Sequence, residues 1–140
     1  MRAFPLLCLL CALIAPAHAA PLLRLEASTV RSEFTASDTF TITAYLFNDG
    51  DTDTSGVITI SAPLGLVACS PDTIAGDIAP DRALQLNACY RVAADAPPGL
   101  ARFVVRGGGL TRAVIVRVGP VVAPFVAPPP IYRVYVPAFL

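Results

Sequence analysis

The sequence has almost no side chain that can exchange a proton near neutral pH. Among 140 residues there is one histidine, His18, and all ten basic residues are arginine, because lysine is absent. We expect His18 to be removed with an N-terminal signal. The remaining chain then has no histidine or lysine, which excludes Ser-His-Asp, Cys-His and Ser-Lys sites and histidine-ligated metals. We therefore predict a protein that is not an enzyme and has no cofactor.

The N-terminal segment has the three parts of a secretory signal peptide. Arg2 is positively charged, residues 6–14 are apolar, and Ala17-His18-Ala19 has the small-x-small pattern that signal peptidase recognises. The apolar run is too short to cross about 30 Å of hydrocarbon. We expect residues 1–19 to be a cleaved signal peptide and the mature protein, without a transmembrane span, to be secreted or periplasmic.

Two cysteines remain after the signal peptide, Cys69 and Cys89. In an oxidising compartment such a pair usually bridges, so we predict a disulfide between them. The pattern leaves open whether Cys89 reaches Cys69 across neighbouring strands, because Cys89 lies on the face opposite Leu84 and Leu86.

Apolar and polar residues alternate through residues 20–118, and no segment has helical periodicity. In the run 38–47, Phe40, Ile42, Ala44 and Leu46 share one face, which predicts a half-buried β-strand. Six further runs extend the pattern: 22–28, 56–62, 66–69, 83–92, 101–106 and 110–118. We predict an all-β domain over residues 20–118, an immunoglobulin-like β-sandwich of about seven strands, with a small β-barrel as the alternative.

Glycine, asparagine and proline mark the turns between these runs. Asn48-Asp49-Gly50 predicts a tight turn, because asparagine and glycine accept positive φ at low cost. Gly107-Gly108-Gly109 predicts a hairpin with a flexible tip between the last two strands.

The order of these turn signals carries a resemblance to a known group of proteins. The signals are Asn48-Asp49-Gly50, Gly56-Val57, Pro63-Leu64-Gly65-Leu66, Gly76-Asp77-Ile78-Ala79-Pro80 and Pro98-Gly99. They resemble CARDB-type and related bacterial repeat modules over about residues 27–118. The resemblance implies an immunoglobulin-like domain of a secreted or cell-surface protein, a spacer or adhesion-associated unit without catalytic residues. Asp81 departs from it, because such modules commonly have a turn glycine there.

The charges are few and unevenly distributed. The formal net charge is zero, so no overall field recruits nucleic acid. Residues 20–81 contain two arginines and nine acids, a balance of −7, whereas residues 82–140 contain seven arginines and one acid, a balance of +6. Because antiparallel strands interleave, we expect early and late strands to pair and these charges to neutralise each other.

Two groups of charged residues are candidate sites. Asp49, Asp51 and Asp53 alternate like calcium ligands, but the rest of the calcium-loop pattern is absent. We therefore predict no metal site, and these three aspartates are the candidates for calcium ligands. Arg102 and Arg106 share one face of a strand, and Arg112 follows the glycine turn. Together they are a candidate partner-binding patch, with ordinary outward-facing strand positions as the alternative.

The C-terminal segment 119–140 is rich in proline, with six in 22 residues. We expect an extended tail that cannot join a sheet interior. Its residues 131–136, including Tyr132 and Tyr135, are a candidate strand that adds to the edge of a partner, with a mobile or self-packing tail as the alternative.

These observations favour a non-enzymatic module that acts through protein–protein contacts at the cell envelope, with an unknown protein partner. The alternative is a calcium- or glycan-binding module that uses the acidic loop 48–55. For sugars, tryptophan is absent and there are only four tyrosines, of which Tyr45 and Tyr90 are the candidates for weak stacking platforms.

Overall fold

The computed structural model describes residues 21–120, which contain strands and no helix. The expected signal peptide 1–19 and the tail beyond residue 120, with Tyr132 and Tyr135, lie outside the described residues. Within residues 21–120 there is accordingly no helix long and apolar enough to cross a membrane. The strands are β1 (Leu23–Thr29), β2 (Glu33–Phe34), β3 (Thr39–Asn48), β4 (Thr54–Ser61), β5 (Leu66–Ala68), β6 (Thr73–Ile78), β7 (Arg82–Val92), β8 (Gly99–Gly107) and β9 (Leu110–Val118).

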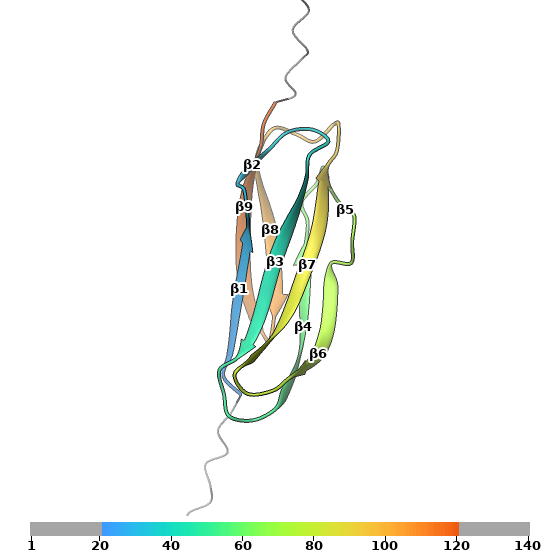
Figure 1. Ribbon diagram of the computed structural model, residues 1–140. Coiled ribbons are helices and arrows are strands. Elements are labelled where there is room, and N and C mark those ends of the chain that lie inside the picture. Colours follow the sequence, from blue (N-terminus) through green and yellow to red (C-terminus); the bar gives the residue numbers. More distant parts are fainter. Residues whose placement is uncertain (1–20, 121–140) are drawn as a thin grey trace, which may run out of the picture.

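The strands form two sheets that pack face to face (Figure 1). One sheet has the order β1-β3-β7-β5 and the other β2-β9-β8-β4-β6. The sheets stay separate instead of closing on themselves, which confirms the predicted immunoglobulin-like β-sandwich and makes the β-barrel alternative wrong. The expected strand number was too low, because β2 and β6 were not predicted.

Both edges of the sandwich are formed by segments that pass from one sheet to the other. At one edge, β1 pairs with β3, and the chain then crosses so that β2 pairs in parallel with β9. At the opposite edge, β5 pairs with β7, and the chain crosses so that β6 pairs with β4. Each edge is therefore divided between two strands that belong to different sheets.

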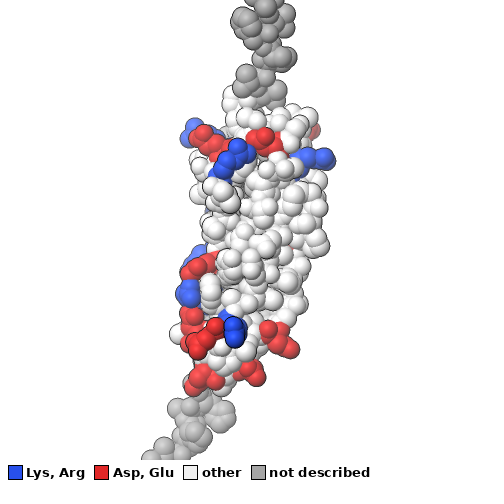
Figure 2. All heavy atoms as spheres, in the orientation of Figure 1, with Lys and Arg blue, Asp and Glu red and all other residues white. Residues whose placement is uncertain are grey.

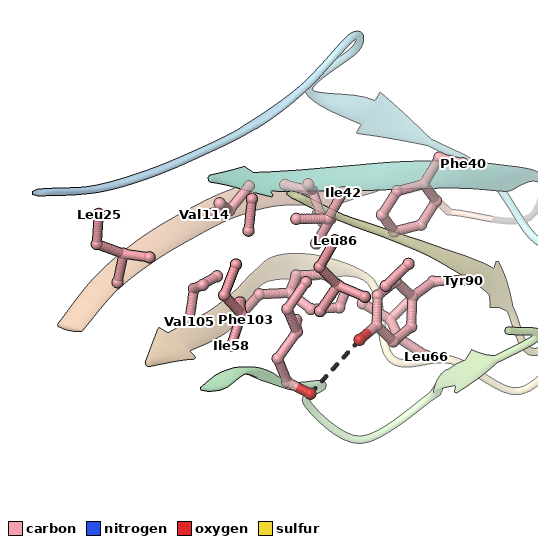
Figure 3. Close-up of a cluster of buried hydrophobic side chains, with 14 of the residues drawn as sticks. Leu25, Phe40, Ile42, Ile58, Leu66, Leu86, Tyr90, Phe103, Val105 and Val114 are labelled. Atoms are coloured by element: carbon pink, nitrogen blue, oxygen red, sulfur yellow. Dashed lines mark hydrogen bonds between the residues drawn. The ribbon is translucent and has the colours of Figure 1, made fainter. Parts of the chain in front are cut away.

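The core lies between the sheets and is aromatic at one end (Figure 3). Phe34 stacks on Phe40 with ring centroids 4.0 Å apart, and Tyr90 lies 4.8 Å from Phe103. The Tyr90 hydroxyl donates a hydrogen bond to the Ile60 carbonyl oxygen at 3.5 Å. Burial raises the pKa of Tyr90 to about 12, which reflects the cost of placing a phenolate in this apolar core.

The β8–β9 hairpin has a tight two-residue turn. Gly107 pairs with Leu110, and the central residues Gly108 and Gly109 have φ of 57° and 77°. Two successive positive φ values characterise the type I′ turn, which matches the twist of the flanking strands. The predicted hairpin is confirmed, but its tip is a defined turn that lies against Leu23 rather than a loose linker.

Candidate functional site

The acidic segment 48–55 crosses between the two sheets, because β3 ends at Asn48 and β4 begins at Thr54 in the other sheet. Asn48 is fully buried, and its Nδ2 donates to the carbonyl oxygens of Thr52 at 2.7 Å and Ile78 at 3.0 Å. Its Oδ1 accepts a hydrogen bond from the Gly50 amide at 3.1 Å. Neither Asn48 nor Gly50 has positive φ, so that reason for the turn was wrong. The asparagine side chain itself holds the turn and joins it to β6.

The three aspartates of this segment do not form a common site. Arg24 on β1 donates to both carboxylate oxygens of Asp49, from Nε at 2.7 Å and from Nη2 at 3.3 Å, and also contacts Glu26. Asp51 and Asp53 lie on the exposed part of the crossing. Within residues 21–120, no three histidine, cysteine, aspartate or glutamate side chains come together as they would around a metal ion. The crossing is thus ordered by an ion pair and by Asn48.

The Arg24–Asp49 pair predicts a pH dependence of stability. Hydrogen bonding to Arg24 holds the pKa of Asp49 below its ordinary value of 3.8. Because the folded-state pKa is depressed, the pair stabilises the protein above pH 3.8, and its contribution is lost as the pH falls through the folded-state pKa. We expect Asp49→Asn to lower the melting temperature at neutral pH, with a difference from wild type that shrinks in acid. Melting curves of both proteins, recorded from neutral pH down to below pH 3.8, test this expectation. A difference in melting temperature that does not change with pH would contradict it.

Cys69 and Cys89 form the predicted disulfide, with their Cα atoms 5.2 Å apart. Cys69 follows β5, and Cys89 lies in the neighbouring strand β7, which answers how the two residues meet. The Cys69 amide donates to the Cys89 carbonyl oxygen at 2.9 Å, and the Cys89 amide donates to Ser70 Oγ at 2.8 Å. The disulfide therefore fixes the chain where it leaves one sheet for the other.

The three candidate arginines do not share one face. Arg102 and Arg106 project from the outer face of β8, but Arg112 on β9 pairs with Val105, which is buried on the inner face. The Nε atom of Arg112 donates instead to the carbonyl oxygen of Leu25, at 3.1 Å, on the edge strand β1. A patch containing Arg112 was therefore wrong. The length of the turn fixes which β9 residue lies opposite each β8 residue. Because a flexible tip was expected from the sequence, the face on which Arg112 lies could not be determined.

A different arginine joins Arg102 and Arg106. Arg117 on β9 pairs with the exposed residue Leu100 and so lies on the same outer face. We call this surface the arginine face, and it was not predicted from the sequence. It consists of Leu100, Arg102, Val104 and Arg106 of β8 and Ala113, Ile115 and Arg117 of β9.

No carboxylate of residues 21–120 neutralises the arginines at the centre of the arginine face. Three of the ion pairs within residues 21–120 involve Arg24 or Arg31, and only Arg117, 3.9 Å from Glu33, joins the early and late parts of the chain. Neither Arg102 nor Arg106 has a carboxylate of residues 21–120 within 4.0 Å. The expected neutralisation between early and late strands is therefore wrong for β8.

The outer face of the other sheet is different in character. Figure 2 shows that its centre has no charged side chain, and that charges lie along the β1 edge and at both ends. Tyr45 and Phe47 stack there with centroids 5.6 Å apart, and the Arg24 guanidinium lies 4.1 Å from the Phe47 centroid. Tyr90, the other predicted stacking residue, is fully buried and unable to contact a sugar.

Comparisons with known proteins identify the fold alone. No family model matches the chain, and no curated protein matches it. A structure of Escherichia coli alpha-2-macroglobulin, from domain MG7 to the C-terminus, is similar with a TM-score of 0.62 and 18% identity, covering 74% of this chain. A β-glucosidase from Erythrobacter marinus has a TM-score of 0.53 and 9% identity over 70% of this chain.

An alkylpurine DNA glycosylase from Pseudomonas fluorescens, bound to DNA with an abasic site analogue, has a TM-score of 0.53 and 7% identity over 69% of this chain. The matched part is 17% of the macroglobulin chain, 15% of the glucosidase chain and 30% of the glycosylase chain. The chain thus spans only a small part of each of these proteins.

Proposed function

We propose that this protein is a non-enzymatic immunoglobulin-like module that is exported to the bacterial cell envelope, periplasmic or secreted, and acts there through contacts with another protein. The observation that carries the proposal is that the protein has a surface suited to contact with a partner but few side chains suited to catalysis. The arginine face presents Arg102 and Arg106, which have no carboxylate partner among residues 21–120, beside exposed apolar side chains. The chain beyond the expected signal peptide has no histidine or lysine for proton transfer.

The disulfide supports export, because such bonds persist in oxidising compartments and are rare in the cytosol. The resemblance to bacterial repeat modules agrees with a role in the envelope. The acidic crossing 48–55 supports calcium binding less well, since Asp49 is already paired with Arg24. The neutral face with Tyr45 and Phe47 keeps glycan binding as the alternative, at a place other than that crossing.

We expect the full-length chain, expressed in a bacterial host, to be recovered from the periplasm or medium with both cysteines oxidised. Cell fractionation and alkylation of Cys69 and Cys89 with and without reductant measure this. Recovery from the cytosol with free thiols would contradict export.

Contact with a protein is tested by cross-linking in the cell of origin. Because lysine is absent, amine-reactive reagents are unsuitable, so a photo-reactive residue is placed at Val104 on the arginine face or at Val67 on the other sheet. We expect one cross-linked protein, identified by mass spectrometry, to bind the purified chain in a reciprocal assay. If neither position yields such a protein, the proposed mode of action is wrong.

A further inference from the structure

We propose that the arginine face is a docking surface for an acidic protein partner, one whose carboxylates bracket an apolar side chain. This rests on the proposed function, and it specifies the surface and the chemistry of its partner.

The spacing of side chains on β8 carries the first step. Arg106, Val104, Arg102 and Leu100 follow one another at every second residue, so the outer row of β8 alternates cationic and apolar side chains. Successive residues rise about 3.3 Å along a strand, which places neighbours in this row about 7 Å apart and the two arginines about 13 Å apart.

The neighbouring strand widens this row into a surface. Ala113 lies opposite Val104, and Ile115 lies opposite Arg102. Leu100 and Ile115 are 72% and 55% exposed, so the apolar part of the face is accessible to a partner. Arg102 thus lies opposite Ile115 and between Leu100 and Val104, and these three apolar residues form the apolar strip of the face. Arg106 adjoins the strip only through Val104, because it lies opposite Thr111 of β9 and Thr59 of β4.

The charges select the partner. A guanidinium presents its donors in a planar fork that fits a carboxylate. No carboxylate of residues 21–120 lies within 4.0 Å of Arg102 or Arg106, so their donors are open to a partner's carboxylates. A second copy docked through the same face would place arginines against arginines, because a two-fold interface is self-complementary. Like charges disfavour that contact, whereas an acidic surface is complementary.

The apolar strip favours a protein over an anionic polysaccharide. Protein interfaces combine arginine anchors with apolar contact at their centre. An anionic polysaccharide would satisfy the arginines but would leave Ile115 and Leu100 without a comparable role. An anionic lipid surface also covers apolar side chains, so binding to vesicles is an outcome that the test must separate from binding to a protein.

The test uses the full mature chain and a synthetic peptide that has glutamate at every fourth residue and leucine midway between glutamates. We expect the peptide to bind the wild-type chain. The double variant Arg102→Glu, Arg106→Glu should bind the peptide at least about tenfold more weakly. Fluorescence anisotropy of the labelled peptide measures the affinity. Leu100→Ser with Ile115→Ser should also weaken it, which simple charge attraction does not predict.

A matched control is Arg82→Glu with Arg91→Glu, the same change of charge on β7 in the other sheet. This variant should bind the peptide within about twofold of wild type. If the glutamate variant of the arginine face melts below wild type, Arg102→Gln with Arg106→Gln replaces it. If the variants of Arg102 and Arg106 and the variant of Arg82 and Arg91 lose the same affinity for the peptide, the attraction is non-specific and the proposal is wrong.

Two further probes separate the classes of partner. The first probe is heparin, and the second is vesicles of phosphatidylglycerol. If either binds through Arg102 and Arg106 while the peptide does not bind, the assignment of the partner to the proteins is wrong. A partner found by cross-linking that binds the Arg102→Glu, Arg106→Glu variant as well as wild type would refute the docking face alone and leave the proposed function intact. The absence of any cross-linked partner, with the peptide still bound, would refute the proposed function instead.

Discussion

Replacing Asn48 with alanine should lower the free energy of unfolding by about 3 kcal/mol. The change removes the hydrogen bonds to Thr52, Ile78 and Gly50 and leaves the Ile78 carbonyl oxygen without this donor in a buried position. A buried polar group left unpaired costs about 1–3 kcal/mol, and the cavity left by the shortened side chain adds to this. Chemical denaturation and thermal melting measure the loss, which corresponds to roughly 12–24 °C in melting temperature.

Asn87→Ala is the matched control. Asn87 lies on the outer face of β7, where its Oδ1 accepts hydrogen bonds from Thr43 at 3.0 Å and Gln85 at 3.2 Å. Because water replaces these partners, we expect this variant to lose less than about 1 kcal/mol. Similar losses in the two variants would show that burial of Asn48 does not govern the stability of the crossing.

Removing the disulfide with Cys69→Ala and Cys89→Ala should lower the free energy of unfolding by about 3 kcal/mol. The bond closes a loop with a sequence separation of 20, and in the chain-entropy model such a loop restricts the unfolded chain by about this amount. Denaturation of wild type in reductant should reproduce the loss, whereas the double variant should be insensitive to reductant. A wild type that melts unchanged after reduction, with free thiols verified by mass spectrometry, would contradict the prediction.

Besides this effect on the unfolded chain, removing the bond should loosen the folded protein near Cys69. Cys69 lies at the crossing between β5 and β6, so amides there should exchange hydrogen faster in the double variant than amides of the β8–β9 hairpin. Uniformly faster exchange would indicate that the bond acts only on the unfolded chain.

The long inner strands were predictable from the sequence. In β3, Phe40, Ile42, Ala44 and Leu46 are all at most 8% exposed, as the alternation predicted. The pattern was clear because a strand between two neighbours, with one covered face, has apolar residues at every second position. β7 follows the same rule.

The edge strand β6 was missed because it contains small residues. Gly56 of β4 pairs with Gly76 of β6, and both glycines had been interpreted as turn signals. A Cβ atom at Gly56 would lie 2.6 Å from Leu46 Cδ2, and one at Gly76 would lie 3.1 Å from Leu84 Cδ1. These glycines therefore make room for leucines of the opposite sheet, a requirement of packing between sheets that local sequence does not reveal.

Asp81 adopts a left-handed backbone conformation in the turn before β7, with a φ of 57°. Aspartate tolerates this left-handed region better than most residues. Its amide donates to the Asn48 carbonyl oxygen at 2.9 Å, so the turn also supports the crossing.

The candidate site was only partly predictable. The outward direction of Arg102 and Arg106 follows from alternation along β8, and the placement of Arg117 follows from the hairpin register once the turn length is known. That these arginines lack carboxylate neighbours depends on which strands flank β8, which the sequence pattern leaves undetermined.

The parallel pairing of β2 with β9 has a mechanical consequence. The described chain begins at one end of the sandwich and finishes at the other (Figure 1). Tension between these ends reaches β2 through β1, which is itself paired with β3, and it pulls β2 and β9 in opposite directions along their length. The bonds from the Arg117 amide to the Ser32 carbonyl oxygen and from the Gly119 amide to the Phe34 carbonyl oxygen, both 2.7 Å, are then loaded together in shear. A domain loaded this way resists stretching better than one whose strands are peeled apart bond by bond.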